Sequence, residues 1–336
     1  MVMIPLIYHP LILILIGIWG YTISLFFLDW QGIHVNSLVY THPSNHLNQL
    51  EPFFILSVTL TWFILVHFIL LENTLLVQYA ILSDYFSPVV FCYSVCVCIV
   101  LWGPCAKEAN RFLRCLYRLL VPLSYTRVYF SDILVADVLI SFSSVLTLLF
   151  IQIISQIKSV SIHASIPPII TSMRITDAFS SLPYLIRLKQ CCNDYSKGIP
   201  RNKRHLFNAL KYTSSIPVIF LAQFKHHPIM GYLWLMLAVS THVFAFGWEL
   251  VMDWGLIQYN CGSIRWRKDG WFSDMRWYLA ASVINLNIRM IKLMASVYPI
   301  HAFYIDLFEI IRRWIWVIFR FEYEHVKSSF SKSSQT

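Results

Sequence analysis

Residues 5–28 read PLIYHPLILILIGIWGYTISLFFL, a run without a single charged side chain. About 20 apolar residues are enough to cross a bilayer, so this run predicts a membrane-spanning helix. A signal peptide carries a basic segment before its apolar run and small residues at a cleavage site. Residues 1–28 have neither feature, and we expect the segment to be retained as the first span.

The rest of the chain has the same apolar character. Of its 336 residues, 57% are hydrophobic and only 13% are charged, whereas soluble domains are about 45–50% apolar and about 25% charged. Soluble, disordered, collagen-like and coiled-coil classes are therefore excluded. The sequence predicts an all-α polytopic membrane protein.

Apolar segments of crossing length recur along the chain. Six are clear and three are weaker because they carry polar or charged residues, which predicts about nine transmembrane helices. The segment 108–122 repeats Arg every three to four residues beside Leu and Tyr, a pattern typical of a helix that lies on the membrane surface. The clear spans are 5–28, 51–72, 86–104, 131–156, 230–252 and 276–299, and the weaker ones are 166–187, 205–222 and 303–321.

The basic residues indicate the orientation of the chain. Residues 1–106 contain no Lys or Arg. Sixteen basic residues fall in the segments 105–130, 188–204 and 254–276 and in the C-terminal tail, against only Lys158 and Lys225 in the alternate loops. Because cytoplasmic loops are enriched in Lys and Arg, we expect these three loops and the C-terminus to be cytosolic. Nucleic acid is not an expected partner, since long basic runs with interleaved aromatics are missing.

The remaining eight basic residues fall within or at the ends of the predicted spans. Each costs at least about 2.5–3.5 kcal/mol at a bilayer centre, so these side chains must be paired, hydrated or directed into a polar cavity. The cations are Arg174, Arg187, Lys211, Arg289, Lys292, Arg312, Arg313 and Arg320, and the available acidic partners are Asp132, Asp137, Asp177, Glu249, Asp253, Asp306 and Glu309.

Two interpretations of these charges stay open on physical grounds. The first is structural: buried ion pairs join the helices, and cations near span ends such as Arg187 and Arg320 reach toward the membrane surface. The second is that the excess of positive charge receives an anion. Arginine presents a planar fork that matches phosphate oxygens, so phosphate is the favoured occupant, with sulfate or a carboxylate as alternatives. We expect the nearby carboxylates to keep the anion from binding too tightly for release.

Five blocks in the second part of the chain form a recognisable pattern. In order and spacing they resemble the EXS domain of eukaryotic SPX–EXS phosphate exporters and of the yeast ER-retention-defective Golgi protein. The resemblance covers about residues 110–325, and DWQGIHVNSLVY (29–40) also looks like the region that precedes the domain. The blocks are ADVLIS (136–141), LPYLIRLKQC (182–191), HLFNALKYTSS (205–215), WELVMDWG (248–255) and EIIRRWIWVIFRFEYEH (309–325).

The resemblance implies a multi-pass protein of the Golgi membrane that moves inorganic phosphate from lumen to cytosol. This phosphate is released during glycosylation, and the resemblance also implies a role in retention of glycosyltransferases and ER residents. Since the chain begins almost at once with an apolar segment, regulation through an SPX domain is not expected. The implied organisation is N-terminal helices over 1–107, an EXS domain over 108–325 with an interfacial helix and six spans around a basic pathway, and a cytosolic tail over 326–336.

Carried over position by position, the resemblance also implies a phosphate site. Two positions depart from the exporters: Ile140 stands in place of an Asn and Lys292 in place of a gating Trp. The implied phosphate-binding residues are Asp137, Arg187, Lys211, Tyr212, Asp253, Arg289, Arg312 and Arg313, and the implied residues for charge balance or gating are Ser141, Glu249, Lys292 and Glu309.

We expect no catalytic residues, no metal and no cofactor. The expected partners are inorganic phosphate and membrane lipids, and a homodimer is the candidate assembly. The alternative function is a membrane scaffold or sorting factor, in which the basic loops 188–204 and 254–276 hold a Golgi glycosyltransferase-sorting adaptor and the buried charges only fix helix packing. Loop mutations that impair retention without changing phosphate flux would favour this alternative.

Overall fold

Nearly every element in the described part of the chain is helical, as the composition predicts. The computed structural model describes residues 8–35, 38, 50–72, 106–121, 128–160, 173–197, 202–260, 263–267, 270–272, 274–295 and 298–333. Within these ranges two short strands accompany the helices. The elements are α1 (His9–Trp30), α3 (Leu50–Glu72), α7 (Ala106–Leu120), α8 (Phe130–Ser141), α9 (Ser143–Val160), α10 (Met173–Lys197), α11 (Lys203–Leu221), the 3₁₀ turn η2 (Ala222–Phe224), α12 (Pro228–Trp248), the π-helical segment η3 (Glu249–Asp253), β1 (Ile257–Asn260), β2 (Ser263–Trp266), α13 (Met275–Met294) and α14 (Ala302–Ser333).

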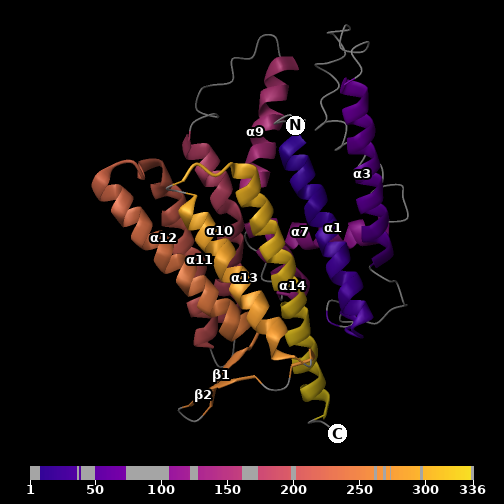
Figure 1. Ribbon diagram of the computed structural model, residues 1–336, viewed down its shortest axis with the longest axis vertical. Helices are drawn as coiled ribbons and strands as arrows, with labels where there is room; N and C mark the ends of the chain where they lie inside the picture. Colours follow the sequence, from indigo (N-terminus) through magenta and orange to yellow (C-terminus); the bar gives the residue numbers. More distant parts are fainter. Residues whose placement is uncertain are drawn as a thin grey trace.

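Three helices in the described ranges are long and apolar enough to cross a membrane. They are α1, residues 51–69 of α3, and α12 together with η3, and the bent pair α8 and α9 forms a fourth candidate. Helices α10, α11, α13 and α14 run alongside (Figure 1) and carry the charges that the hydropathy pattern flagged. The predicted span 86–104 lies outside the described residues. The fold class is confirmed, and the number of nine spans stays a prediction.

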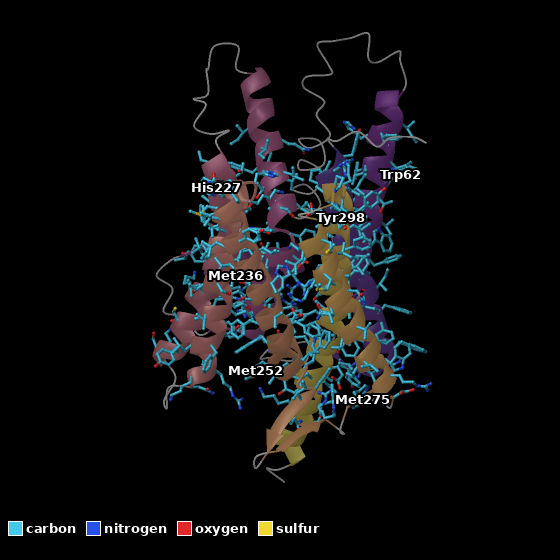
Figure 2. All side chains as sticks on the ribbon, turned by 60° about the vertical axis from the view of Figure 1, so that its left-hand side comes forward. Trp62, His227, Met236, Met252, Met275 and Tyr298 are labelled. Carbon is cyan, nitrogen blue, oxygen red and sulfur yellow. The ribbon has the colours of Figure 1, made fainter. Side chains whose placement is uncertain are left out.

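The outer faces of the helices are apolar. Trp62 on α3 and Met236 on α12 are 64% and 70% exposed, and Figure 2 shows apolar side chains covering these outer surfaces. Such a surface suits hydrocarbon rather than water, because helices leave no backbone polar group unsatisfied toward lipid. The chain is a membrane protein.

Helix α1 joins the rest of the molecule through polar contacts on one side and close packing on the other. Thr22 lies 3.1 Å from Ser57, and Trp19 donates to the Thr61 hydroxyl over 3.0 Å. Toward α14 there is no room for a side chain at Gly20, since a Cβ there would lie 1.7 Å from Trp314. Small residues permit such close helix contacts in membranes.

A helix occupies the predicted interfacial segment. In Figure 1, α7 runs across the direction of the long helices. Cys115 and Leu119 face inward, while Phe112, Leu113 and Tyr117 are exposed. This amphipathic pattern suits a membrane surface, although its position there stays a prediction. Arg118 on α7 pairs with Asp132 at 2.5 Å. Asp132, one of the acidic residues available to the eight cations of the predicted spans, therefore pairs with a cation outside those spans.

The predicted span 131–156 is broken into two helices. Helices α8 and α9 meet at an angle of 70°. The sequence at the break is Ser-Phe-Ser-Ser over 141–144, and serines hydrogen-bond locally in ways that compete with a continuous helix. The break places Ser141 beside the charged residues of α14. It also directs Ser144 to Asp306, at 2.5 Å.

Helix α12 ends in a turn of π-helix. The Trp254 amide donates to the Glu249 carbonyl over 2.9 Å, the five-residue spacing of this helix type. The chain then reverses at Gly255, whose φ of 60° favours glycine. A Cβ at Gly255 would also lie 2.2 Å from the Tyr323 ring. The antiparallel hairpin of β1 and β2 follows, paired from Ile257 with Trp266 to Asn260 with Ser263.

The largest hydrophobic core lies toward the hairpin. It contains Trp254, Leu256, Tyr278, Phe319 and Phe321. Trp254 packs on Phe319 with a centroid distance of 5.2 Å, and Phe319 packs on Tyr278 at 5.1 Å. Figure 1 shows the hairpin and the C-terminal end of α14 at the same end of the molecule, away from the start of α1. Helix α14 continues to residue 333, so the expected tail 326–336 is helical over most of its length.

Candidate functional site

A polar cavity of about 90 Å³ lies among α8, α10, α11, α12, η3, α13 and α14. One water needs about 10–15 Å³ on this scale, so the cavity has room for several waters or one small oxyanion. The lining is polar and charged, apart from Ile140 and Ala245. Its charged residues are Asp137, Lys211, Glu249, Asp253, Arg289, Lys292, Glu309, Arg312 and Arg313.

One corner of the cavity is built around Asp137. Its Oδ1 accepts hydrogen bonds from Arg187 Nε and from the Tyr212 hydroxyl, both at 2.8 Å. Arg187 also donates to Gln190 Oε1 over 2.5 Å, and its guanidinium lies over the Tyr212 ring at 5.0 Å. Arg187 is thus buried in an ion pair, and the interpretation that it reaches toward the membrane surface is wrong.

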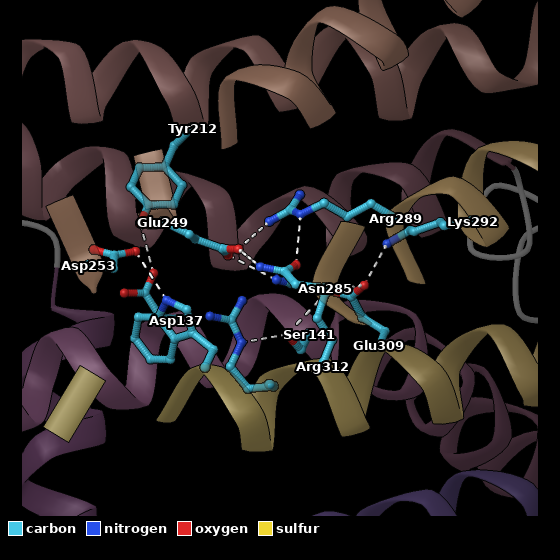
Figure 3. A network of polar contacts seen from close by, with 12 residues as sticks. Asp137, Ser141, Tyr212, Glu249, Asp253, Asn285, Arg289, Lys292, Glu309 and Arg312 are labelled. Atoms are coloured by element: carbon cyan, nitrogen blue, oxygen red, sulfur yellow. Dashed lines mark hydrogen bonds and ion pairs between the residues drawn. The ribbon is translucent and has the colours of Figure 1, made fainter. Parts of the chain in front are cut away.

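The centre of the site is a network of four charged residues (Figure 3). Glu249 pairs with Arg312 Nη1 at 2.9 Å and with Arg289 at 2.8 Å. Arg312 also pairs with Glu309, its neighbour three residues earlier, at 2.5 Å. Asn285 joins Glu249 to Arg289 by donating to the first and accepting from the second. The π-helical segment places Glu249 in this position.

Lys292 forms the more open side of the network. Its ammonium lies 3.8 Å from Glu309 Oε2, and its side chain is 43% exposed. Arg289, Arg312 and Arg313 are all below 10% exposed. Lys292 is therefore the most exposed cation of the described cavity lining.

Two further buried cations differ from the rest because they have no carboxylate partner within 4 Å in the described part of the chain. Arg313 donates from Nε to Ser141 Oγ over 2.7 Å, and its guanidinium lies 4.7 Å from the Trp316 ring centre. The Lys211 ammonium faces the rings of Tyr212 and Trp248, at 4.4 and 5.2 Å. The nearest carboxylates, Asp137 and Asp253 among them, act on these two cations only over longer distances, so neither charge is neutralised by direct contact.

Asp253 lies at the side of the cavity nearest the hairpin. Its Oδ2 accepts from the Trp316 indole over 3.1 Å. Arg320 donates to the backbone carbonyls of Met252 and Asp253 and pairs with Glu324 at 3.0 Å. Arg320 therefore caps η3 instead of reaching freely toward the membrane surface.

The described charges around the cavity do not balance. Among the described lining residues five cations face four carboxylates, which leaves a formal charge of +1. All residues expected in the phosphate site lie at this cavity or contact its lining: Arg187 and Ser141 stand directly behind Asp137 and Arg313. The lining cations are Lys211, Arg289, Lys292, Arg312 and Arg313, and the carboxylates are Asp137, Glu249, Asp253 and Glu309.

Several predicted charges lie elsewhere, and several lining residues were not predicted. Asp306 accepts from Ser144 and does not line the cavity. Asp177 is also outside the lining, and the side chain of Arg174 is outside the described residues. A search of the sequence for charged residues does not find Asn285, which joins the network, or the neutral polar residues of the lining. The neutral polar lining residues are Tyr184, Ser215, Thr241 and His242.

A second buried ionic cluster, which we call the hairpin cluster, lies at the end of the molecule that carries β1 and β2. Arg267 pairs with Glu322 at 2.6 Å, and their side chains are 3% and 0% exposed. Glu322 also accepts from the Tyr278 hydroxyl and the Trp271 amide, at 2.9 and 2.7 Å. The sequence predicts Arg267 in a cytosolic loop; the structure shows its side chain buried in an ion pair, and the side of the membrane stays a prediction.

Comparison with known proteins gives the family. The model described as the EXS family matches residues 4–326. The chain belongs to the EXS family. This membership covers almost the whole chain, including the first helices, which the blocks quoted above do not reach. It confirms the resemblance inferred from those blocks.

Three relatives illustrate the range of the family. The SYG1 homolog of Schizosaccharomyces pombe is 30% identical over 158 residues, 44% of this chain and 23% of that protein. Protein ERD1 homolog 1 of the same yeast is 26% identical over 355 positions, covering 96% of this chain and 91% of the relative. Solute carrier family 53 member 1 of Mus musculus is 28% identical over 166 residues, 44% and 24% of the two chains. This chain thus spans about a quarter of the SYG1 homolog and of the mouse solute carrier.

Proposed function

We propose that the protein transports inorganic phosphate across the Golgi membrane, from lumen to cytosol. The observation that carries the proposal is the pair of buried cations, Arg313 and Lys211, which face the cavity without a carboxylate partner in the described ranges. The relative named as a solute carrier supports transport. Tetrahedral oxyanions fit this chemistry because guanidinium and ammonium groups donate toward several oxygens at once.

The arrangement of the cavity suggests a route for the anion. Lys292 receives it on the exposed side, and Arg313 and Lys211 hold it farther in. The aromatic core around Trp254 and Phe319 closes the hairpin side, so passage requires that this packing open. On the proposed orientation, the Lys292 side faces the lumen, and the hairpin and C-terminus face the cytosol.

The cellular role follows from the family and belongs to the same proposal. Glycosylation releases phosphate in the Golgi lumen, and its return to the cytosol would support retention of glycosyltransferases and ER residents. The likeness to Protein ERD1 homolog 1 over nearly the full chain favours this role. The proposal assigns no enzymatic step to the cavity. Its residues act by binding an anion and releasing it.

The deciding experiment is flux of labelled phosphate into and out of proteoliposomes that hold the purified full chain. We expect saturable flux in the unmodified protein and loss of that flux in Arg313→Ala, Arg312→Ala and Arg289→Ala. Arg276→Ala is the matched control, because Arg276 is 90% exposed and pairs with Asp274 outside the cavity. Sulfate as a competitor tests the choice of oxyanion.

Two results would contradict the proposal. The first is flux no higher than in empty liposomes from correctly folded protein, which would favour the sorting scaffold. The second is unchanged flux in Arg313→Ala. For the scaffold alternative, Arg267 of the second loop is excluded as an adaptor contact, because it is buried against α13 and α14.

A further inference from the structure

Three of the five N–H groups of the Arg312 guanidinium donate to carboxylates. Its Nε and Nη2 donate to Glu309 over 3.3 and 2.5 Å, and its Nη1 donates to Glu249 over 2.9 Å. The residue is 4% exposed. In this conformation Glu309 occupies the Nε–Nη2 edge of Arg312, an edge that could otherwise bind two oxygens of a phosphate, although the family resemblance implies that Arg312 binds phosphate.

The two carboxylates that hold Arg312 are bound differently. Glu249 comes from η3 and is joined to two other helices by Asn285, Arg289 and Arg312, at 2.7–2.9 Å. Breaking these contacts would separate helices. Glu309 lies on α14 itself, three residues before Arg312, so its ion pair with Arg312 joins no second element.

The other contacts of Glu309 are long. Ser141 lies 3.4 Å from its Oε1, and Lys292 lies 3.8 Å from its Oε2. Both atoms are close enough to receive the carboxylate if it leaves Arg312. Glu309 therefore has an alternative position within the cavity wall, while Glu249 is fixed from three directions.

We propose that Glu309 is a tethered competitor of the transported anion. It occupies Arg312 when the cavity is empty, moves toward Lys292 when phosphate arrives, and returns to expel the phosphate. A carboxylate and a phosphate offer the same paired oxygens to a guanidinium. When phosphate replaces the Glu309 carboxylate, or the reverse, the buried edge of Arg312 keeps a negatively charged partner. A buried arginine that loses its partner would be unstable. This inference rests on the proposed transport function.

Removal of the negative charge of Glu309 should increase the affinity of the cavity for phosphate. In Glu309→Gln, the Nε–Nη2 edge of Arg312 is no longer held by a charged carboxylate and can bind the anion. We expect phosphate to bind on the order of tenfold more tightly, as is usual for a coupling between two sites. We expect the maximal flux to fall as well, because release slows. Loss of electrostatic repulsion alone would also tighten binding, and Glu309→Asp, which keeps the charge but shortens its reach to Arg312, separates the two causes.

The test compares binding and flux in the purified full chain. Equilibrium binding of labelled inorganic phosphate gives Kd, and proteoliposome flux gives KM and maximal rate. Glu324→Gln is the matched control, since Glu324 is on the same helix, pairs with Arg320 and Lys327, and lies outside the cavity. We expect Kd to fall in Glu309→Gln and to stay unchanged in Glu324→Gln.

The other results are also decisive. Equal or weaker binding by folded Glu309→Gln would overturn the inference while leaving phosphate transport intact. Failure of the unmodified protein to bind phosphate would overturn the transport proposal itself. If Glu309→Gln does not fold, Glu309→Asp keeps the charge and shortens its reach to Arg312. Tighter binding by that variant supports the competitor role, and weaker or equal binding refutes it.

Discussion

The cavity and the hairpin cluster both bury an arginine beside a glutamate and tyrosine rings, and yet their charge balance differs. In the hairpin cluster one cation, Arg267, meets one carboxylate, Glu322, whose side chain is 0% exposed. The rings of Tyr278 and Tyr323 lie over Arg267 at 5.3 and 5.6 Å. In the cavity the cations outnumber the carboxylates, and open space of about 90 Å³ remains.

The difference shows which feature marks a binding site. A buried ion pair by itself fixes packing, and replacing one by apolar groups is often neutral for stability. Arg313 and Lys211 contact aromatic rings and, for Arg313, a serine hydroxyl, but no carboxylate within 4 Å in the described ranges, and open space lies beside them. We therefore expect variants in the hairpin cluster to change stability, and variants in the cavity to change anion binding.

The largest expected effect on stability is at Arg267. Arg267→Met leaves the Glu322 charge buried without its cation, so the free energy of unfolding should fall by about 3–5 kcal/mol. Thermal or denaturant unfolding in detergent measures this loss. Flux per folded molecule should stay close to that of the unmodified protein.

A double variant sharpens the same prediction. Glu322→Gln added to Arg267→Met removes the stranded charge and keeps an oxygen that accepts from Trp271 and Tyr278. Stability should recover in part. If the double variant were as unstable as the single one, the uncompensated charge would not be the cause.

At Lys211 we expect a small change in stability and a larger change in phosphate binding. Its ammonium has aromatic contacts and no carboxylate within 4 Å in the described ranges. Lys211→Met should lower the free energy of unfolding by less than Arg267→Met does, since it breaks no ion pair within 4 Å in the described ranges. Phosphate should bind on the order of tenfold more weakly, a loss of about 1.4 kcal/mol. A stability loss as large as that of Arg267→Met would erase the distinction between the two regions.

The smallest effect concerns selectivity at Asp253. The carboxylate lines the cavity, with the Trp316 indole bound to one oxygen. An ionised carboxylate accepts hydrogen bonds only, so it suits the hydroxyl of a protonated phosphate and repels sulfate. In Asp253→Asn the ratio of phosphate to sulfate affinity should fall about fivefold, the value of one hydrogen bond. Competition of sulfate with labelled phosphate measures the ratio, and an unchanged ratio would exclude this role.

The sequence predicted much of the site because charge inside an apolar segment is rare. Arg187, Lys211, Arg289 and the Arg312–Arg313 pair stand out by hydropathy alone, and the structure brings them together. Their positions along the chain do not reveal which of them lie close together in the fold. The structure adds that Asp137 binds Arg187 from a helix 50 residues earlier.

The errors have physical causes too. Arg267 follows a strand in a segment with several other basic residues, so its composition resembled a solvated loop, whereas tertiary contacts with α13 and α14 bury it. Asn285 carries no charge and gave no signal, although its amide connects Glu249 to Arg289. The bend near Phe142 was missed because serines are tolerated within apolar spans.

The π-helical turn makes the cavity sensitive to deletion of a single residue within η3. Because η3 closes over five residues, it contains one residue more than the α-helical path would need. A one-codon deletion at Val251 would let the segment rewind as α-helix, at about 100° and 1.5 Å per residue. Asp253 would then leave the cavity wall while every charged residue remained in the chain. Gaps within residues 249–253 should therefore be rarer among functional relatives than substitutions at the same positions.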